Sequence, residues 1–337
     1  MRIVYMGTPD FAVKPLALLY EAGYALPLVV TQPDKPRGRG QKDSFSPVKA
    51  YAAANGLPII QPTHLEEEDA ITQIRDARPD VIIVVAYGQM LPPALLDLPP
   101  LGCLNIHPSL LPSLRGAAPI QWALLNGDTE TGISIMKMDK GWDTGPVLWQ
   151  EKRPIPDGMD YGGLNAILME SGAELLLKAL PLWAEHRLQA ADQATDCCTY
   201  APRLTRRHEV IDWTRTAVEI RNQIRAFSPA PGASAILQHT EIKILDALAL
   251  TEDEAAALIA PGDPAVATFP PVQSDGYGAK PLPGQIVGLA RKRGPITAAG
   301  TGYLLITRVQ PAGKKCMDAR DWLNGSHLAP GQRFRIE

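Results

Sequence analysis

The sequence predicts an α/β protein in which a doubly wound sheet domain precedes a small β-barrel domain. Up to about residue 185, short β-branched runs alternate with amphipathic or Ala-rich segments, as expected for strands joined by crossover helices. After residue 205, Pro and Gly punctuate short alternating runs that are typical of a small barrel. The length of 337 residues favours two domains, because one hydrophobic core seldom serves so long a chain.

The expected elements of the first domain alternate between strand and helix. Apolar runs predict strands at residues 2–7, 24–32, 57–61, 80–88, 103–107 and 132–138. Amphipathic or Ala-rich stretches predict helices at residues 11–23, 46–56 and 118–128. A longer helical stretch at 164–186 closes this half. We therefore place the first domain at residues 1–188.

The second half of the chain has a different sequence pattern. Residues 189–205 are polar and aperiodic, which predicts a linker. The barrel domain is expected at 206–337, beginning with a helix at 217–227 and including a strand at 302–310. Residues 250–284 are rich in Ala and Pro, so we expect a long surface excursion there.

Composition excludes several classes of protein. Apolar residues make up 45% and charged residues 20% of the chain, as in an ordinary soluble globular protein. The first residues lack a signal-peptide pattern, and no apolar run approaches the roughly 20 residues that span a bilayer. We therefore expect a cytoplasmic protein. The four cysteines form no CxxC pair and the six histidines are scattered, so no metal is expected.

Charge is unevenly distributed along the chain. Residues 1–204 carry 17 Lys and Arg against 23 Asp and Glu, whereas residues 205–337 carry 16 against 13. From residue 280 onward, 10 basic residues stand against 3 acidic ones. A basic second domain indicates a polyanionic partner, and Arg308, Lys314 and Lys315 are the expected phosphate contacts. The alternative is that Lys314 and Lys315 are exposed charges on a hairpin and bind nothing.

The turn after the first expected strand argues against a dinucleotide site. It contains "MGTPDF", with Gly7 alone where a dinucleotide-binding protein would carry G-x-G-x-x-G. The sheet is therefore expected to bind another ligand beyond the carboxyl ends of its strands. The stretch "CLNIHPSLLPSLRGAAPIQ", residues 103–121, lies at such an end.

Two polar side chains interrupt the apolar strand in this stretch. Asn105 and His107 share one face of the strand because residues two apart point the same way, and Ile106 points to the other face. Pro108 then ends the regular ladder. An amide and an imidazole side by side can donate hydrogen bonds to a carbonyl oxygen that becomes negative, so they are a candidate oxyanion site. The alternative is a buried pair satisfied by neighbouring backbone.

A carboxylate follows the next expected strand. In "MDKGWDTG", residues 138–145, the two glycines permit tight turns that can hold Asp143 near His107. Such a carboxylate would favour the imidazolium and could accept the proton of an attacking amine. No G-x-S-x-G motif supplies a covalent nucleophile. The expected chemistry is direct acyl transfer.

Together, several motifs resemble one family. "LNIHPSLLPSLRGAAPIQ", "MDKGWDTG", "TQPDKPRGRGQK", "AYGQMLP" and "RVQPAGKKCMDARDWLNG" occur in the order found in the methionyl-tRNA formyltransferase family. The resemblance implies a Rossmann-like formyltransferase domain followed by an OB-like β-barrel domain. It also implies transfer of the formyl group of 10-formyltetrahydrofolate, the cosubstrate, to the amino group of methionine on initiator methionyl-tRNA.

The resemblance assigns roles to residues at matching positions. It implies that Asn105, His107 and Asp143 are catalytic. The tetrahydrofolate-binding segment would be Ser109, Leu110, Leu111 and Pro112. The basic loop at residues 33–42, with Arg39 and Lys42, would contact the acceptor end of the tRNA.

Two other functions stay open at this point. One is a formyltransferase for an amino-sugar nucleotide, which would share the Asn, His and Asp centre but would have no need for the basic loop. The other is an RNA-binding module without activity, which would leave the centre and the folate segment without a use. We expect a monomer that does not bind membranes.

Overall fold

The computed structural model of the chain describes two compact units. The described residues are 1–37, 42–259, 281–290, 293–326 and 328–335. Unit 1 comprises Met1–Ile120, Thr129–Ile155 and Gly163–Arg203. Unit 2 comprises Gln121–Asp128, Pro156–Gly162 and Leu204–Glu337. The predicted linker, residues 189–205, thus falls mostly within unit 1.

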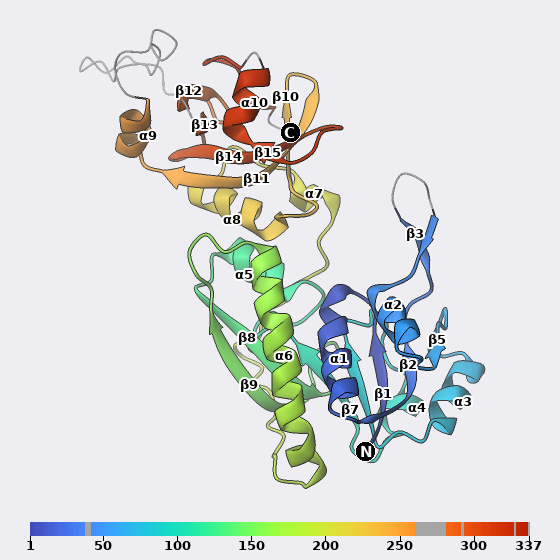
Figure 1. The fold of residues 1–337 in the computed structure, drawn as a ribbon. Coiled ribbons are helices and arrows are strands. Elements are labelled where there is room, and N and C mark those ends of the chain that lie inside the picture. The colour runs from blue at the N-terminus through green and yellow to red at the C-terminus, as the bar shows by residue number, and fades with distance from the viewer. Residues whose placement is uncertain (38–41, 260–280, 291–292, 327, 336–337) are drawn as a thin grey trace. The chain divides into compact units, whose positions relative to one another are not determined.

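Unit 1 is built on a seven-stranded sheet in the order β5-β2-β1-β6-β7-β8-β9 (Figure 1). The strands are β1 (Arg2–Gly7), β2 (Ala25–Val30), β5 (Ile59–Ile60), β6 (Val81–Val85), β7 (Cys103–His107), β8 (Glu130–Lys137) and β9 (Val147–Pro154). The first five in the sheet order pair in parallel, and β8 and β9 are antiparallel additions at one edge. β7 therefore lies between the parallel and the antiparallel parts.

Helices cover both faces of this sheet. They are the 3-10 helix η1 (Asp10–Ala12) and the α-helices α1 (Val13–Glu21), α2 (Pro47–Ala54), α3 (Glu68–Asp76), α4 (Pro93–Leu96) and α6 (Tyr161–Ala184). α1 and α6 share one face, where Lys14 forms an ion pair with Glu170 at 3.1 Å (Figure 1). A Cβ added to Gly172 of α6 would lie 2.8 Å from Ile106. Because α6 packs on Ile106, Asn105 and His107 point to the opposite face.

A short hairpin rises from unit 1 after β2. It pairs β3 (Lys35–Arg37) with β4 (Lys42–Ser44) in antiparallel register. At its base, the carboxylate of Asp34 accepts hydrogen bonds from Lys49 and, at 2.9 Å, from Gln61. The hydrogen bonds from Lys49 and then Gln61 lower the pKa of Asp34. The root of the predicted basic loop is thus fixed by three side chains.

Unit 2 is an antiparallel sheet with the strand order β10-β11-β14-β13-β12, and β15 pairs with β14. Its strands are β10 (Ala233–Leu237), β11 (Thr240–Leu250), β12 (Ile286–Ala290), β13 (Gly294–Ala298), β14 (Tyr303–Pro311) and β15 (Met317–Asp318). Its helices are most of α5 (Pro119–Asn126), α7 (Arg206–Glu209), α8 (Ala217–Phe227), α9 (Glu252–Leu258) and α10 (Ala319–Gly325). Inside it, the rings of Trp213 and Phe334 stack with centroids 4.8 Å apart.

A segment near the end of the chain closes this sheet into a barrel. Arg333 bridges to Gln285 at the start of β12, and Phe334 bridges to Leu237 at the end of β10. The amide of Arg335 donates to the carbonyl of Ile236 at 2.8 Å. The two outer strands of the sheet are therefore joined through one segment, and the predicted fold class is confirmed.

Some elements differ from the prediction. The expected surface excursion at 250–284 begins with helix α9, whose capping box pairs Thr251 with Glu254, and its residues 260–280 lie outside the described ones. Helices α3 and α4 and strand β9 were not predicted. α3 has only a narrow buried stripe, and five of the eight residues of β9 are Gln, Glu, Lys, Arg and Pro. Neither stretch has the sustained apolar pattern of a core element.

Candidate active site

Two of the predicted catalytic residues in unit 1 converge on a carboxylate oxygen of the third. The amide Nδ2 of Asn105 donates to Oδ1 of Asp143 at 3.4 Å. The Nδ1 atom of His107 lies 3.6 Å from the same oxygen. The side chains of His107 and Asp143 are 4% and 15% exposed. β7 and the loop between β8 and β9 thus hold an amide, an imidazole and a carboxylate in one small polar cluster.

The imidazole of His107 has an acceptor at each nitrogen. Its Nε2 lies 3.0 Å from the carbonyl oxygen of Leu114. A carbonyl only accepts, so Nε2 carries a hydrogen and the ring orientation is fixed. Nδ1 is then the nitrogen that faces Asp143, and a hydrogen on it would point toward the carboxylate. This part of the alternative interpretation holds, because neighbouring backbone does satisfy one edge of His107.

Asp143 is held by backbone from another loop. Its Oδ2 accepts a hydrogen bond from the amide of Gly116 at 2.9 Å. Gly116 has a φ of +117°, and a Cβ at that position would lie 2.8 Å from the carbonyl oxygen of Ala201. Glycine is therefore required there, since any side chain would collide with the chain that passes over it.

Sequence reasoning missed two residues that hold the loops of this centre. Gln193 donates to the carbonyl oxygen of Asp143 at 2.9 Å, and Thr199 accepts from the amide of Leu114 at 2.8 Å. Both lie in the segment predicted to be a linker. That segment has neither periodicity nor a recognisable motif, so the sequence offered no signal for a role in the site.

The predicted folate segment forms a tightly bonded turn beside the centre. The hydroxyl of Ser109 donates to the carbonyl of Ser113 at 2.6 Å. The hydroxyl of Ser134 donates to the carbonyl of Ser109 at 2.6 Å and accepts from the amide of Leu111 at 3.1 Å. Gln150 donates to the carbonyl of Leu111 at 2.8 Å. Most polar groups of Ser109–Pro112 are therefore hydrogen-bonded within the protein, and these bonds hold the turn in one conformation.

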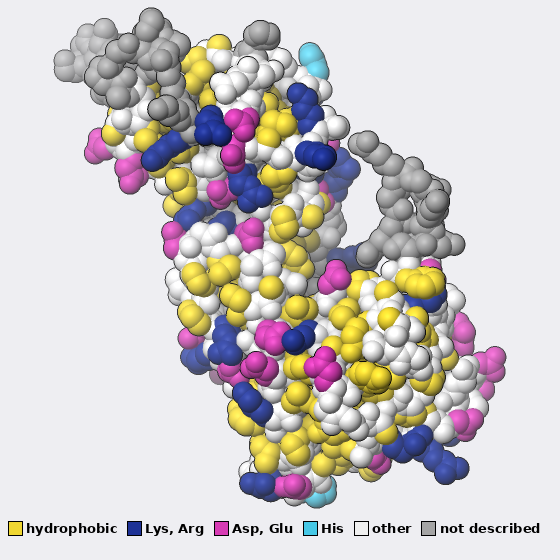
Figure 2. All heavy atoms as spheres, in the orientation of Figure 1, with side chains coloured by type: hydrophobic (Ala, Val, Ile, Leu, Met, Phe, Trp, Pro, Cys, Tyr) yellow, Lys and Arg dark blue, Asp and Glu magenta, His cyan; other side chains and the backbone are white. Residues whose placement is uncertain are grey.

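The predicted nucleic-acid contacts lie in two places. Arg39 is outside the described residues, and Lys42 is described only through its backbone in β4. Arg308 is exposed on β14, and Lys314 and Lys315 are exposed in the turn before β15. On the face shown in Figure 2, Lys and Arg side chains of unit 2 are interspersed with Asp and Glu side chains.

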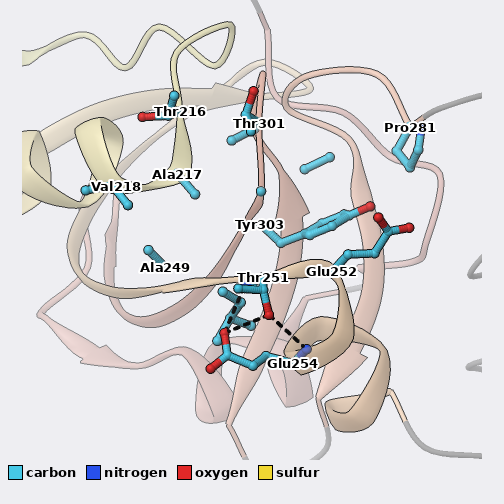
Figure 3. Close-up of a pocket in the computed structure, with 14 residues that line it drawn as sticks. Thr216, Ala217, Val218, Ala249, Thr251, Glu252, Glu254, Pro281, Thr301 and Tyr303 are labelled. Carbon is cyan, nitrogen blue, oxygen red and sulfur yellow. Dashed lines mark hydrogen bonds between the residues drawn. The ribbon is translucent and has the colours of Figure 1, made fainter.

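A separate pocket of about 630 Å³ lies in unit 2 and contains none of the predicted site residues. Its wall includes Val218, Ala249 and Tyr303, as Figure 3 shows. Two of its polar residues, Thr251 and Glu254, bond to each other and cap the first turn of α9. The pocket is mainly apolar and offers no arrangement for acyl transfer.

The described part of the chain shows neither a metal-binding cluster nor a membrane-spanning helix. Within residues 1–37, 42–259, 281–290, 293–326 and 328–335, no three His, Cys, Asp or Glu side chains are grouped to hold a metal ion. Among the helices that the structure describes, none has the length and apolar character needed to cross a membrane.

Known families match nearly the whole chain. The model described as formyl transferase matches residues 1–180, and the model described as formyl transferase, C-terminal domain, matches residues 203–327. The methionyl-tRNA formyltransferase of Thermosynechococcus vestitus is 44% identical over 338 residues, covering 100% of this chain and 98% of that protein. That of Carboxydothermus hydrogenoformans is 44% identical over 334 residues and covers 99% of each.

Solved structures resemble the fold at lower identity. An N-formyltransferase from Helicobacter canadensis, in complex with folinic acid and dTDP-3-aminofucose, matches with a TM-score of 0.61 and 18% identity over 90% of this chain and 98% of its own. HypX from Aquifex aeolicus, in complex with tetrahydrofolic acid, matches with a TM-score of 0.61 and 16% identity. That match covers 96% of this chain and 47% of HypX, so the chain spans about half of HypX.

Proposed function

The chain belongs to the formyl transferase family, and we propose that it transfers the formyl group of 10-formyltetrahydrofolate to the amino group of methionine on initiator tRNA. The product is N-formylmethionyl-tRNA, which serves translation initiation. The observation that carries this proposal is the convergence of Asn105, His107 and Asp143 at one point, within a chain whose relatives of more than 40% identity are named methionyl-tRNA formyltransferases.

The three side chains suit the charges of this reaction. The amine nitrogen forms a bond to the formyl carbon, the carbonyl oxygen becomes negative, and the bond from that carbon to the folate nitrogen then breaks. The amide of Asn105 has a second hydrogen besides the one aimed at Asp143, and we assign that hydrogen to the developing oxyanion. In the imidazolium form of His107, Nδ1 also carries a hydrogen, and we assign that hydrogen to the same oxygen.

Asp143 supplies the complementary function. As the amine attacks, it must lose a proton, and a carboxylate within reach can accept it. The Gly116 amide occupies one oxygen of Asp143, while the other faces Asn105 and His107. Asp143 can pass the proton taken from the amine to the leaving nitrogen of the cosubstrate, so the step is balanced without a covalent intermediate on the chain.

The folate side of the site is assigned to Ser109, Leu110, Leu111 and Pro112. Their fit to a flat ring is supported by the rigidity of the turn, because Ser134 and Gln150 bind its backbone. Leu111 is buried and Leu110 is half-buried. A preorganised turn of this kind orients a ligand and loses little conformational entropy of its own when the ligand binds.

The tRNA side is assigned to the basic loop and to unit 2. Arg39 and Lys42 of the loop would reach the acceptor end, and Arg308, Lys314 and Lys315 would contact phosphates elsewhere on the tRNA. The exposure of the last three residues supports this assignment. An amino-sugar-nucleotide acceptor is the second candidate, since a structural neighbour was solved with dTDP-3-aminofucose.

One acceptor assay tests the proposal. The purified chain is incubated with 10-formyltetrahydrofolate and either charged initiator tRNA or a dTDP-amino sugar, and the formylated product is measured. We expect formylated methionyl-tRNA and no formylated sugar. Formylation of the sugar alone would establish the second candidate, and no formylation of either acceptor would refute the proposal.

A further inference from the structure

Residues 191–201, here called the flanking segment, are hydrogen-bonded into both loops of the candidate centre. Ala191 exchanges two backbone hydrogen bonds of 2.8 Å with Val147, just after the loop that carries Asp143. Farther along, Arg115 donates to the carbonyl of Thr199 at 2.9 Å and accepts from the amide of Ala201 at 2.7 Å. The flanking segment therefore ties the loop after β7 to the loop between β8 and β9.

The side chain of Gln193 occupies the middle of this connection. Its Oε1 accepts from Nε and Nη2 of Arg115 at 3.0 and 2.8 Å. Its Nε2 donates to the carbonyl oxygens of Asp143 and Gly145 at 2.9 and 2.7 Å. Arg115 has only donors and the two carbonyls only accept, so the orientation of the amide is determined. All four of its hydrogen-bonding positions are used.

Arg115 strengthens the grip of Gln193 on the Asp143 loop. Its side chain belongs to a residue that is 5% exposed, and among the described residues no carboxylate forms an ion pair with it. Its positive charge is directed at Oε1 of Gln193, which polarises the amide and makes the Nε2 hydrogens better donors. The charge of Arg115 therefore strengthens the hydrogen bond from Gln193 to the carbonyl of Asp143.

The two residues that orient His107 share an unusual backbone conformation. Leu114 has a φ of +58° and Asp143 a φ of +54°, in the left-handed region that favours glycine. Each contacts the flanking segment: the amide of Leu114 donates to Oγ1 of Thr199 at 2.8 Å, and the carbonyl of Asp143 accepts from Gln193. Without these hydrogen bonds both residues would be free to relax, and the two acceptors around His107 would move.

We propose that Gln193 and Thr199 are positioning residues, which hold the carboxylate of Asp143 and the imidazole of His107 in the arrangement used for transfer. This inference rests on the proposed function of the centre. Gln193 acts through the backbone of Asp143, and Thr199 acts through Leu114, whose carbonyl oxygen faces His107. The segment predicted to be a linker, residues 189–205, therefore contributes positioning residues to the catalytic unit.

Kinetics of Gln193 variants provide the first test. Gln193→Ala should lower kcat by roughly 10- to 100-fold while the KM of each substrate changes by only a few-fold, since small misplacements of reacting groups have such effects. Gln193→Glu should be as damaging, because it places a carboxylate oxygen against two carbonyls. Gln189→Ala is the matched control on an exposed glutamine of the same stretch and should keep parental kcat.

A double-mutant cycle separates positioning from general damage. If Gln193 acts through Asp143, adding Gln193→Ala to Asp143→Ala should cost less than about 3-fold more, since the group it positions is already gone. Multiplicative losses would overturn the inference. For Thr199, replacement by Val should lower kcat and replacement by Ser should restore it, because Ser keeps the acceptor. Equal activity of the Val and Ser variants would count against its role.

A measurement independent of activity completes the test. Hydrogen exchange of the Gly116 amide, which donates to Asp143, should be faster in Gln193→Ala, and that of the Leu114 amide should be faster in Thr199→Val. Unchanged exchange at both amides would overturn the inference even if the parent formylates tRNA. A parent that formylates neither acceptor would refute the proposed function, while the exchange data would still decide whether the flanking segment positions these loops.

Discussion

The centre of unit 1 and the basic turn of unit 2 are built in opposite ways. Asp143 is contacted by side chains or backbone from Asn105, His107, Gly116 and Gln193. Lys314 and Lys315, between β14 and β15, are exposed, and within the described residues no ion pair to either lysine is found. One region has its charges fixed before any ligand arrives, whereas the other leaves them in solvent.

This difference predicts how the two regions respond to substitution. In the centre, each group depends on its neighbours, so one change disturbs several hydrogen bonds and the losses of activity are not additive. In the basic turn, each lysine acts as an independent charge whose effect is screened by salt. Large, salt-insensitive losses are expected in the centre, and small, additive, salt-sensitive losses are expected in the basic turn.

The largest effect should come from removing a donor in the centre. Asn105→Ala or His107→Ala should lower turnover by roughly 10²- to 10³-fold, the loss expected for one hydrogen bond to a developing oxyanion. Steady-state formylation at two salt concentrations measures it, and the loss should be the same at both. His64→Ala, at an exposed histidine of unit 1, is the control. Folded variants that keep turnover within a few-fold of the parent would refute the catalytic assignment.

A smaller effect is expected for the basic turn. The double change Lys314→Ala plus Lys315→Ala should weaken tRNA binding at low salt. It should also reduce the slope of log affinity against log salt by about 0.7 to 0.9 for each phosphate that is no longer neutralised, and therefore by somewhat under two units in all. Binding measured across a salt series shows this. Lys178→Ala, an exposed lysine on α6, should leave the slope unchanged. An unaltered slope in the double variant would exclude these lysines as phosphate ligands.

The smallest effect concerns the stability of unit 2. Hydrogen bonds from the backbone and then the hydroxyl of Thr216, followed by that from Arg215, lower the pKa of Glu219 to about 2. Glu219→Ala should lower the free energy of unfolding by about 1 kcal/mol at neutral pH, the usual value for removal of a helix cap, with the exposed charge contributing little because solvent screens it.

The pH dependence of that change has a defined sign. The pKa of Glu219 is lower in the folded chain than its ordinary value of 4.5, so the carboxylate stabilises the fold fully above about pH 4.5 and loses this effect as the pH falls toward 2. Urea unfolding of parent and variant between pH 7 and pH 3 should show the difference shrinking. A difference that grows on acidification would contradict the assigned cap, and formyl transfer at pH 7 should be unaffected.

The residues predicted correctly to lie together were those whose chemistry is visible locally. Asn105 and His107 stand two apart in one strand, and Asp143 sits between glycines after the next strand. Period-2 geometry, turn chemistry and the pairing of β7 with β8 together bring them to one place. Strand β7 was found because Cys103–His107 is an apolar run that ends at Pro108. Beyond these local features, the prediction needs the pairing of two strands that follow one another along the chain.

The residues that were missed depend on interactions between positions far apart in sequence. Gln193 lies 50 residues from Asp143 and 78 from Arg115, and Thr199 lies 85 from Leu114. A polar residue in an aperiodic stretch has the same sequence pattern whether its side chain faces water or joins a buried hydrogen-bond network. Only the path of the backbone decides which, and that path is set by tertiary packing that no local pattern encodes.

The closure of the unit 2 barrel has a consequence for assembly. Residues 331–335 cover the edges of both β10 and β12, and Arg333 anchors them by donating to the carbonyl of Pro283 at 2.8 Å. If this segment detached, two unpaired strand edges would open at once in one molecule, and each is a template for pairing with another chain. The same segment of a second copy fits that gap, which is the route to domain exchange. One short strand-like stretch thus covers both strand edges that such an exchange would need.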